Sequence, residues 1–256
     1  MRVFGISIPR YPDRYSYLVE HLRKLFGNDF EIVGVDGRAV TFDEGTTTGL
    51  SVGQIGCALS HIAAYRRIVE LDLPYALIVE DDCVLPEDID ALLVQLGSTM
   101  KPGEAIQLYN WSLVTSEFST QDAIYVGRYG LYYPMLMSGL GTTTAYIVTR
   151  EAAERIIRVN YPVVVTADDW SFFQYRGAVS AVRILHPCPV KILPFESTIA
   201  SSKWNTGGWI RRNVFIQSVL SMRRRILFRQ RERNLVFVDR KSPFSAAREI
   251  DRGGAS

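Results

Sequence analysis

Cysteine is scarce in this chain of 256 residues, which contains only Cys57, Cys83 and Cys188. Three cysteines this far apart are too few for a disulfide framework or a zinc site. The first ten residues also lack the apolar segment that follows the basic start of a secretory signal. The few cysteines and the missing signal together favour a protein of the reducing cytoplasm.

Long apolar runs without interruption are missing as well. Residues 129–149 carry no charge and are long enough to cross a bilayer, but glycine, proline and threonine residues break the segment. We expect a buried or site-lining loop here that leads into a strand, and not a membrane span. The composition, with 47% hydrophobic and 22% charged residues, is typical of a soluble globular protein.

The net charge of +2 conceals two regions of opposite charge. Residues 203–256 contain 13 Lys and Arg against 4 Asp and Glu, a net charge of +9, which leaves −7 for residues 1–202. Within the basic segment, residues 209–231 mix arginines with apolar side chains, a pattern typical of an amphipathic helix on an anionic membrane surface. A solvated helix packed on the acidic body is the alternative. We expect no nucleic-acid partner, because the acidic body would repel a duplex.

Segments with strand and helix patterns alternate along residues 1–202. Strands are expected at 3–8, 30–35, 75–80, 105–109, 145–149, 182–185 and 190–193. Helices are expected at 15–26, at 150–159 and from Ser51, which starts a capping box with Gln54, to Pro74. This alternation predicts an α/β fold with a mostly parallel sheet that carries helices on both faces.

The apolar run 75–79 ends in three consecutive acids, Glu80, Asp81 and Asp82. At the C-terminal end of a buried strand, these acids lie at the edge where open α/β sheets bind ligands. Adjacent like charges repel one another, and a divalent cation would relieve the repulsion. Alternation places Glu80 and Asp82 on one side, where their oxygens suit Mg²⁺ or Mn²⁺ better than Zn²⁺. A solvated acidic turn is the alternative.

An ordered set of motifs resembles glycosyltransferase family 25, the bacterial lipopolysaccharide and lipooligosaccharide glycosyltransferases. The motifs are Val35-Asp36-Gly37, Gly53 to His61, Leu77 to Asp82, Gly141 to Ala152, Thr166 to Trp170 and Glu196 to Ile199. The chain differs from the family at Ser7-Ile8-Pro9-Arg10, where an Asn-Leu-Asp type of turn is usual. Gln54 replaces the usual glutamate and can fill the same capping role.

The resemblance implies a GT-A fold over residues 1–202, and the charge and apolar pattern of residues 203–256 predicts a basic helical tail after it. It also implies the transfer of a hexose, with galactose first, from a UDP-sugar to a lipopolysaccharide-type acceptor, with inversion at the sugar carbon. A lipid-linked acceptor would place the enzyme peripherally on the inner face of the cytoplasmic membrane. A metal-dependent phosphotransferase or nuclease, and a non-catalytic membrane-associated factor of glycan assembly, are the alternative functions.

Donor contacts implied by the resemblance surround the first strand and the second helix. They are Ile6, Arg10, Arg14, Asp36, Ser60, His61 and Asp81. Two of these residues also have an ordinary structural interpretation. Asp36-Gly37 is a common turn signal, and a histidine beside the apolar face of a helix, such as His61, is often a core residue.

The cofactor implied is Mn²⁺ or Mg²⁺, held by Asp82 and Glu80 with His186 as a third ligand. A histidine at the end of a strand is also commonly structural. Asp168 and Asp169 are the candidates for the general base that removes the proton from the acceptor hydroxyl. Thr166-x-x-Asp169 also has the pattern of a capping box, which would account for Asp169 but not for Asp168.

Overall fold

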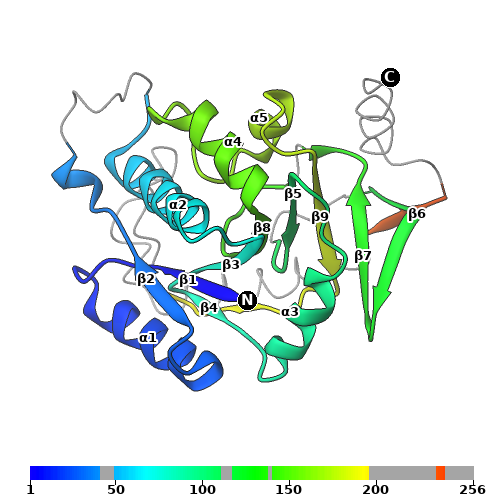
Figure 1. The fold of residues 1–256 in the computed structure, drawn as a ribbon, viewed down its shortest axis with the longest axis horizontal. Coiled ribbons are helices and arrows are strands. Elements are labelled where there is room, and N and C mark those ends of the chain that lie inside the picture. Colours follow the sequence, from blue (N-terminus) through cyan, green and yellow to red (C-terminus); the bar gives the residue numbers. More distant parts are fainter. Residues whose placement is uncertain (41–48, 111–116, 138–139, 196–234, 240–256) are drawn as a thin grey trace, which may run out of the picture.

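The computed structural model describes residues 1–40, 49–110, 117–137, 140–195 and 235–239. The predicted tail helix at 209–231 and the motif Glu196 to Ile199 lie outside these residues. Figure 1 shows a central sheet with helices packed above and below it.

The central sheet has nine strands in the order β11-β6-β7-β9-β5-β8-β3-β1-β2. Their bounds are β1 Arg2–Ile6, β2 Phe30–Val33, β3 Tyr75–Glu80, β5 Glu104–Gln107, β6 Glu117–Val126, β7 Tyr129–Pro134, β8 Ala145–Thr149, β9 Ala181–His186 and β11 Val236–Val238. In this sheet, β8 runs antiparallel to β3 and β5, and β7 runs antiparallel to β6 and β9. The remaining pairs are parallel. Since β7 and β8 alone reverse direction among these strands, the predicted mostly parallel sheet is confirmed.

Helices cover both faces of the sheet, as predicted (Figure 1). One face packs against α2, α4 and α5 (Val52–Glu70, Arg150–Asn160 and Trp170–Tyr175), and the other against α1 and α3 (Pro12–Phe26 and Ile89–Gly97). Alternation along β3 divides the two cores: Ala76 and Ile78 face α2, whereas Leu77 and Val79 face α1 and α3. Glu80 continues the α2 side of this alternation.

The capping box that starts α2 is present. The Ser51 hydroxyl accepts a hydrogen bond from the Gln54 N–H at 3.3 Å, and the Gln54 side-chain oxygen accepts from the Ser51 N–H at 2.8 Å. Glutamine therefore fills the role that the resemblance assigns to glutamate. The box fixes where α2 begins, next to the short 3₁₀ turn η1 (Gly37–Ala39).

The loop expected at the start of 129–149 is wrong. Tyr129–Pro134 form β7, a strand buried along its whole length that pairs with β6 and β9. Because both faces of this strand are covered, its sequence lacks the alternation of polar and apolar residues that marks a half-exposed strand. The helix α3 was also not predicted.

The uncharged stretch 129–149 is not a membrane helix, because β7 and β8 form its two ends. In the part of the chain that the structure describes, no helix is long and apolar enough to cross a membrane. From the basic segment, the structure describes β11, which pairs in parallel with β6 through Phe237 and Phe118. A second, two-stranded sheet joins β4 (Cys83–Val84) to β10 (Lys191–Ile192).

Candidate active site

A cleft of about 430 Å³ lies at the C-terminal ends of β1, β2 and β3. Residues that follow these three parallel strands form its floor, and the first turns of α1 and α2 form its walls. This is the edge at which open α/β sheets bind ligands. Seven of the predicted site residues line the cleft, namely Ile6, Arg14, Asp36, Ser60, Glu80, Asp81 and Asp82.

Asp81 is held on the α1 side of the cleft. Its Oδ2 accepts a hydrogen bond from the Ser7 hydroxyl at 2.7 Å, and its Oδ1 accepts from the Arg14 Nε at 2.8 Å and also from Arg14 Nη2. Both carboxylate oxygens are therefore engaged by the protein. Arg14 is fixed in turn, and its guanidinium lies 5.3 Å from the ring centre of Phe195. Asp81 thus holds the positively charged guanidinium of Arg14 at the cleft wall.

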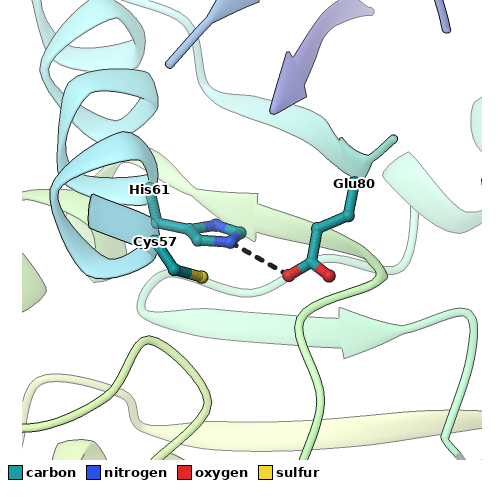
Figure 2. A group of neighbouring side chains, drawn as sticks. All are labelled: Cys57, His61 and Glu80. Atoms are coloured by element: carbon teal, nitrogen blue, oxygen red, sulfur yellow. Dashed lines mark hydrogen bonds and ion pairs between the residues drawn. The ribbon is translucent and has the colours of Figure 1, made fainter. Parts of the chain in front are cut away.

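Glu80 points to the opposite side, toward α2. Its Oε1 lies 3.2 Å from His61 Nε2 (Figure 2). The same Oε1 accepts a hydrogen bond from the Thr143 hydroxyl at 2.6 Å. Burial raises the pKa of Glu80, but the contacts with His61 and Thr143 and the charge of Arg14 outweigh burial and lower it overall. Glu80 is therefore an ionised carboxylate at the cleft edge.

His61 is a buried histidine with partners on both ring nitrogens. Its Nδ1 lies 2.8 Å from the Tyr146 hydroxyl, which lies 2.7 Å from the Tyr65 hydroxyl. An imidazole protonated at Nε2 satisfies the whole series, because Tyr65 donates to Tyr146, Tyr146 to Nδ1, and Nε2–H to Glu80. His61 does not line the cleft itself; it positions the Glu80 carboxylate that does.

Asp82 contrasts with its two neighbours. Its Oδ1 is buried and has no hydrogen-bond partner among the described residues, and its Oδ2 lies 3.6 Å from Arg14 Nη2. Burial and the charge of Glu80 raise the pKa of Asp82 to about 6. A buried carboxylate oxygen without a partner, beside a second carboxylate, fits a hard divalent cation. Glu80 and Asp82 both line the cleft, although β3 ends at Glu80 and Asp82 reaches the cleft from the following turn.

His186 is not brought to these acids. It ends β9, which is separated from β3 by β5 and β8, a spacing of roughly 14 Å across the sheet. Its ring lies 5.9 Å from that of Phe237. His186 therefore stands apart from the cleft and from Asp82.

The two candidate bases differ in their surroundings. Asp169 is the N-cap of α5, and its Oδ1 accepts a hydrogen bond from the Phe172 N–H at 2.9 Å. The expected capping box with Thr166 as N-cap is therefore wrong by three positions. Asp168 faces the loop before β8, with its Oδ2 3.9 Å from where a Cβ on Gly141 would lie. Its charge contributes to a raised pKa of the Cys57 thiol, after burial and Glu80. Asp168 is thus the member of the pair without a capping role.

Two glycines allow the backbone after β2 to lie directly against α2 in the wall of the cleft. A Cβ at Gly56 would lie 2.7 Å from the Gly37 nitrogen, and a Cβ at Gly37 would lie 2.0 Å from the Val52 carbonyl oxygen. No other residue type permits this approach of η1 to α2. A glycine inside a helix destabilises the helix by about 1 kcal/mol relative to alanine. The presence of Gly56 in a predicted helix could therefore have indicated a close backbone contact at this position.

Three predicted donor residues hold this wall together. Asp36 caps η1 by accepting from the Arg38 N–H at 3.1 Å, and it pairs with Arg10 at 3.6 Å. The Ser60 hydroxyl donates to the Gly56 carbonyl at 2.7 Å and accepts from the Val35 N–H at 2.9 Å. Asp36 also lines the cleft, whereas both of these hydrogen bonds of the Ser60 hydroxyl are made to the protein backbone.

Comparison with known proteins gives a consistent match. Residues 38–171, just over half of the chain, match the model of glycosyltransferase family 25, described as a lipopolysaccharide biosynthesis protein. A Haemophilus influenzae protein named "Putative glycosyltransferase" is 26% identical over 195 residues, covering 70% of this chain and 65% of that protein. Mouse procollagen galactosyltransferase 2 is 26% identical over 144 residues, which are 49% of this chain and 20% of the mouse protein.

A bovine relative is named "Probable inactive glycosyltransferase 25 family member 3". It is 28% identical over 141 residues, which cover 49% of this chain and 21% of the bovine protein. The chain thus spans about a fifth of the length of these mammalian relatives. The match to the family model includes α2, β3 and the three consecutive acids, so the aligned region contains the α2 wall of the cleft and Glu80, Asp81 and Asp82, whereas Arg14 and Asp36 precede it.

Proposed function

This chain belongs to glycosyltransferase family 25, and we propose that it transfers a hexose from a UDP-sugar to a saccharide acceptor with the aid of Mn²⁺ or Mg²⁺. The observation that carries the proposal is the pair of acids that line the cleft, Glu80 and Asp82, because the buried Oδ1 of Asp82 has no hydrogen-bond partner within the described part of the chain. Galactose is the first candidate sugar, because the mouse relative is named a galactosyltransferase.

A divalent cation held by Asp82 and Glu80 would neutralise charge on the departing diphosphate. The chain's own residues supply the rest of the site. Arg14, fixed by Asp81, adds positive charge at the same cleft, and the turn at Asp36 offers a carboxylate to the ribose or base. Both carboxylate oxygens of Asp81 are used within the protein, whereas the Oδ1 of Asp82, which has no hydrogen-bond partner among the described residues, would be left for the cation.

Proton removal from the acceptor hydroxyl falls to Asp168 in this proposal. The Asp169 side-chain oxygen already accepts a hydrogen bond from the Phe172 N–H. Asp168 instead faces the small residue Gly141, which lies two positions before Thr143, the residue that contacts Glu80. A general base is typically worth about 10²–10⁴-fold in rate. Attack by the acceptor from the side opposite the diphosphate would invert the sugar carbon.

The acceptor is proposed to be a lipopolysaccharide-type glycan linked to lipid. The description of the family supports this choice, and so does the basic composition of residues 203–256. An amphipathic basic segment would hold the enzyme peripherally on the anionic inner face of the cytoplasmic membrane.

The test is binding and turnover of a panel of UDP-sugars with Mn²⁺, for the wild type, Asp82→Asn and the control Glu87→Gln. Glu87 is an exposed acid paired with Lys24 on the surface. We expect metal-dependent turnover of one UDP-sugar by the wild type and the control, with a large loss in Asp82→Asn. Cleavage of a phosphodiester substrate would instead favour a phosphotransferase or nuclease.

A non-catalytic assembly factor is the second candidate, and the bovine relative named inactive is the observation that favours it. Such a protein would keep the fold without turning over any sugar nucleotide. If no UDP-sugar is consumed while the protein is folded and loaded with metal, the transferase proposal is refuted and the assembly role takes its place.

A further inference from the structure

Three side chains of different chemistry meet behind the cleft. Cys57 and His61 are four residues apart on α2, so they lie on the same face of the helix, and Glu80 approaches that face from the end of β3. The sulfur of Cys57, a ring nitrogen of His61 and a carboxylate oxygen of Glu80 all lie within 4.8 Å of one another (Figure 2).

The spacing of these atoms is close to that of a tetrahedral metal site. With metal–ligand bonds of about 2.0–2.3 Å, neighbouring ligand atoms lie roughly 3.3–3.8 Å apart. His61 Nε2 and Glu80 Oε1 are already 3.2 Å apart, so a small rotation of the Cys57 side chain would complete the triangle. Cys57 makes no hydrogen bond among the described residues, and its sulfur is therefore available.

The surroundings supply what a metal-bound histidine requires. A ligating histidine normally uses its other ring nitrogen to donate a hydrogen bond, which fixes the orientation of the ring. When Nε2 binds a cation, the ring proton moves to Nδ1, where the Tyr146 oxygen lies 2.8 Å away to accept it. Tyr65 contacts Tyr146 from behind at 2.7 Å and fixes it in turn.

We infer that Cys57, His61 and Glu80 form a binding site for a thiophilic divalent cation such as Zn²⁺. Sulfur and imidazole ligands select Zn²⁺ over the hard cations Mn²⁺ and Mg²⁺. Binding releases the thiol proton to solvent and leaves a fourth position open toward the cleft, because Cys57 and Glu80 both line it. This site departs from the expectation, based on three scattered cysteines, that the chain has no zinc site, because one sulfur is here combined with an imidazole and a carboxylate.

Glu80 belongs to both this site and the proposed Mn²⁺ site at Asp82. A Zn²⁺ ion held by Cys57 would draw the Glu80 carboxylate away from Asp82, so Zn²⁺ is an inhibitor of metal-dependent transfer. This consequence rests on the proposed function, whereas the existence of the site does not.

The test is a titration of the metal-free full chain with Co²⁺, a spectroscopic substitute for Zn²⁺. Thiolate bound to Co²⁺ gives a sulfur-to-cobalt charge-transfer band, and tetrahedral Co²⁺ gives intense visible bands. We compare the wild type with Cys57→Ala and with the control Cys188→Ala, because both cysteines are half-buried and outside any disulfide. Asp82→Asn is a third variant, which separates the two cation sites.

We expect the charge-transfer band in the wild type, in Cys188→Ala and in Asp82→Asn, its loss in Cys57→Ala, and its removal by Zn²⁺. The inference is overturned if the folded wild type shows no band, or if Cys57→Ala keeps it. None of these readings uses a sugar nucleotide. A band with no turnover therefore refutes only the proposed function, and turnover without a band refutes only this inference.

Discussion

Replacing Asp82 by asparagine is expected to stabilise the folded protein. The pKa of Asp82 rises from 3.8 to about 6, with burial as the largest cause and the charge of Glu80 next. A pKa difference of one corresponds to 1.36 kcal/mol, so keeping this carboxylate ionised in the folded state costs about 3 kcal/mol at most. Asparagine has nearly the same shape and no charge, and it removes that cost.

The effect depends on pH in a defined direction. Above pH 6 the folded state carries the full cost, and below pH 3.8 the group is protonated in both states and contributes nothing. The difference in unfolding free energy between Asp82→Asn and the wild type should therefore be largest near pH 8 and shrink toward zero near pH 4. Urea unfolding at several pH values, with Glu87→Gln as a surface control, measures it.

A divalent cation should reverse the ranking. A ligand present at about 1,000 times its dissociation constant stabilises the folded state by about 4.1 kcal/mol, which exceeds the cost of about 3 kcal/mol, and we expect Mn²⁺ at such an excess to do so for the wild type but not for Asp82→Asn. Two results would refute this reasoning. One is that Asp82→Asn is less stable than the wild type at pH 8 without metal. The other is that the difference in unfolding free energy between the two proteins does not change with pH.

Three further predictions concern the parts of the molecule around Asp82. Tyr146→Phe removes the hydroxyl that contacts His61 Nδ1 and the Tyr65 hydroxyl and should lower the unfolding free energy by about 1–3 kcal/mol for each lost contact, whereas the exposed Tyr175→Phe should change it little. Gly56→Ala should cost about 1–3 kcal/mol and weaken UDP binding measured by calorimetry, because the new methyl group meets the backbone of η1. Replacing the arginines of residues 209–231 by glutamine should abolish flotation of the full chain with anionic vesicles; unchanged flotation would show that this segment does not bind the membrane.

The elements with one clear pattern could be predicted from the sequence. The capping box at Ser51 fixed the start of α2, and the β-branched run 145–149 gave β8 without error. The strand β7 was missed because it is covered on both faces and carries glycine and proline, which read as loop signals. The sheet order was not predictable either, since β5 and β9 pair through contacts between residues far apart in the chain.

The sequence predicted seven of the residues that line the cleft, but only some of the roles that these residues have there. The three acids were correctly placed at the edge of the sheet, because a strand that ends in charges must end at the surface. What the acids do there depends on partners from elsewhere in the chain. Asp81 accepts hydrogen bonds from Ser7 and Arg14, 74 and 67 residues away in sequence, whereas the Oδ1 of Asp82 has no hydrogen-bond partner among the described residues. No local pattern distinguishes these neighbours.

His61 shows why the structural and functional interpretations of a residue need not exclude each other. From the sequence, it was either a core histidine or a residue of the site. In the structure it is 1% exposed and its Nδ1 contacts the buried Tyr146, yet its Nε2 contacts Glu80, which reaches the cleft. Burial is what makes this contact effective, because a hydrogen bond shielded from water is stronger and fixes the geometry of its acceptor. Burial raises the pKa of Glu80, and the contact with His61 is the largest of the effects that lower it, so the place of His61 in the core is a condition for its role at the site.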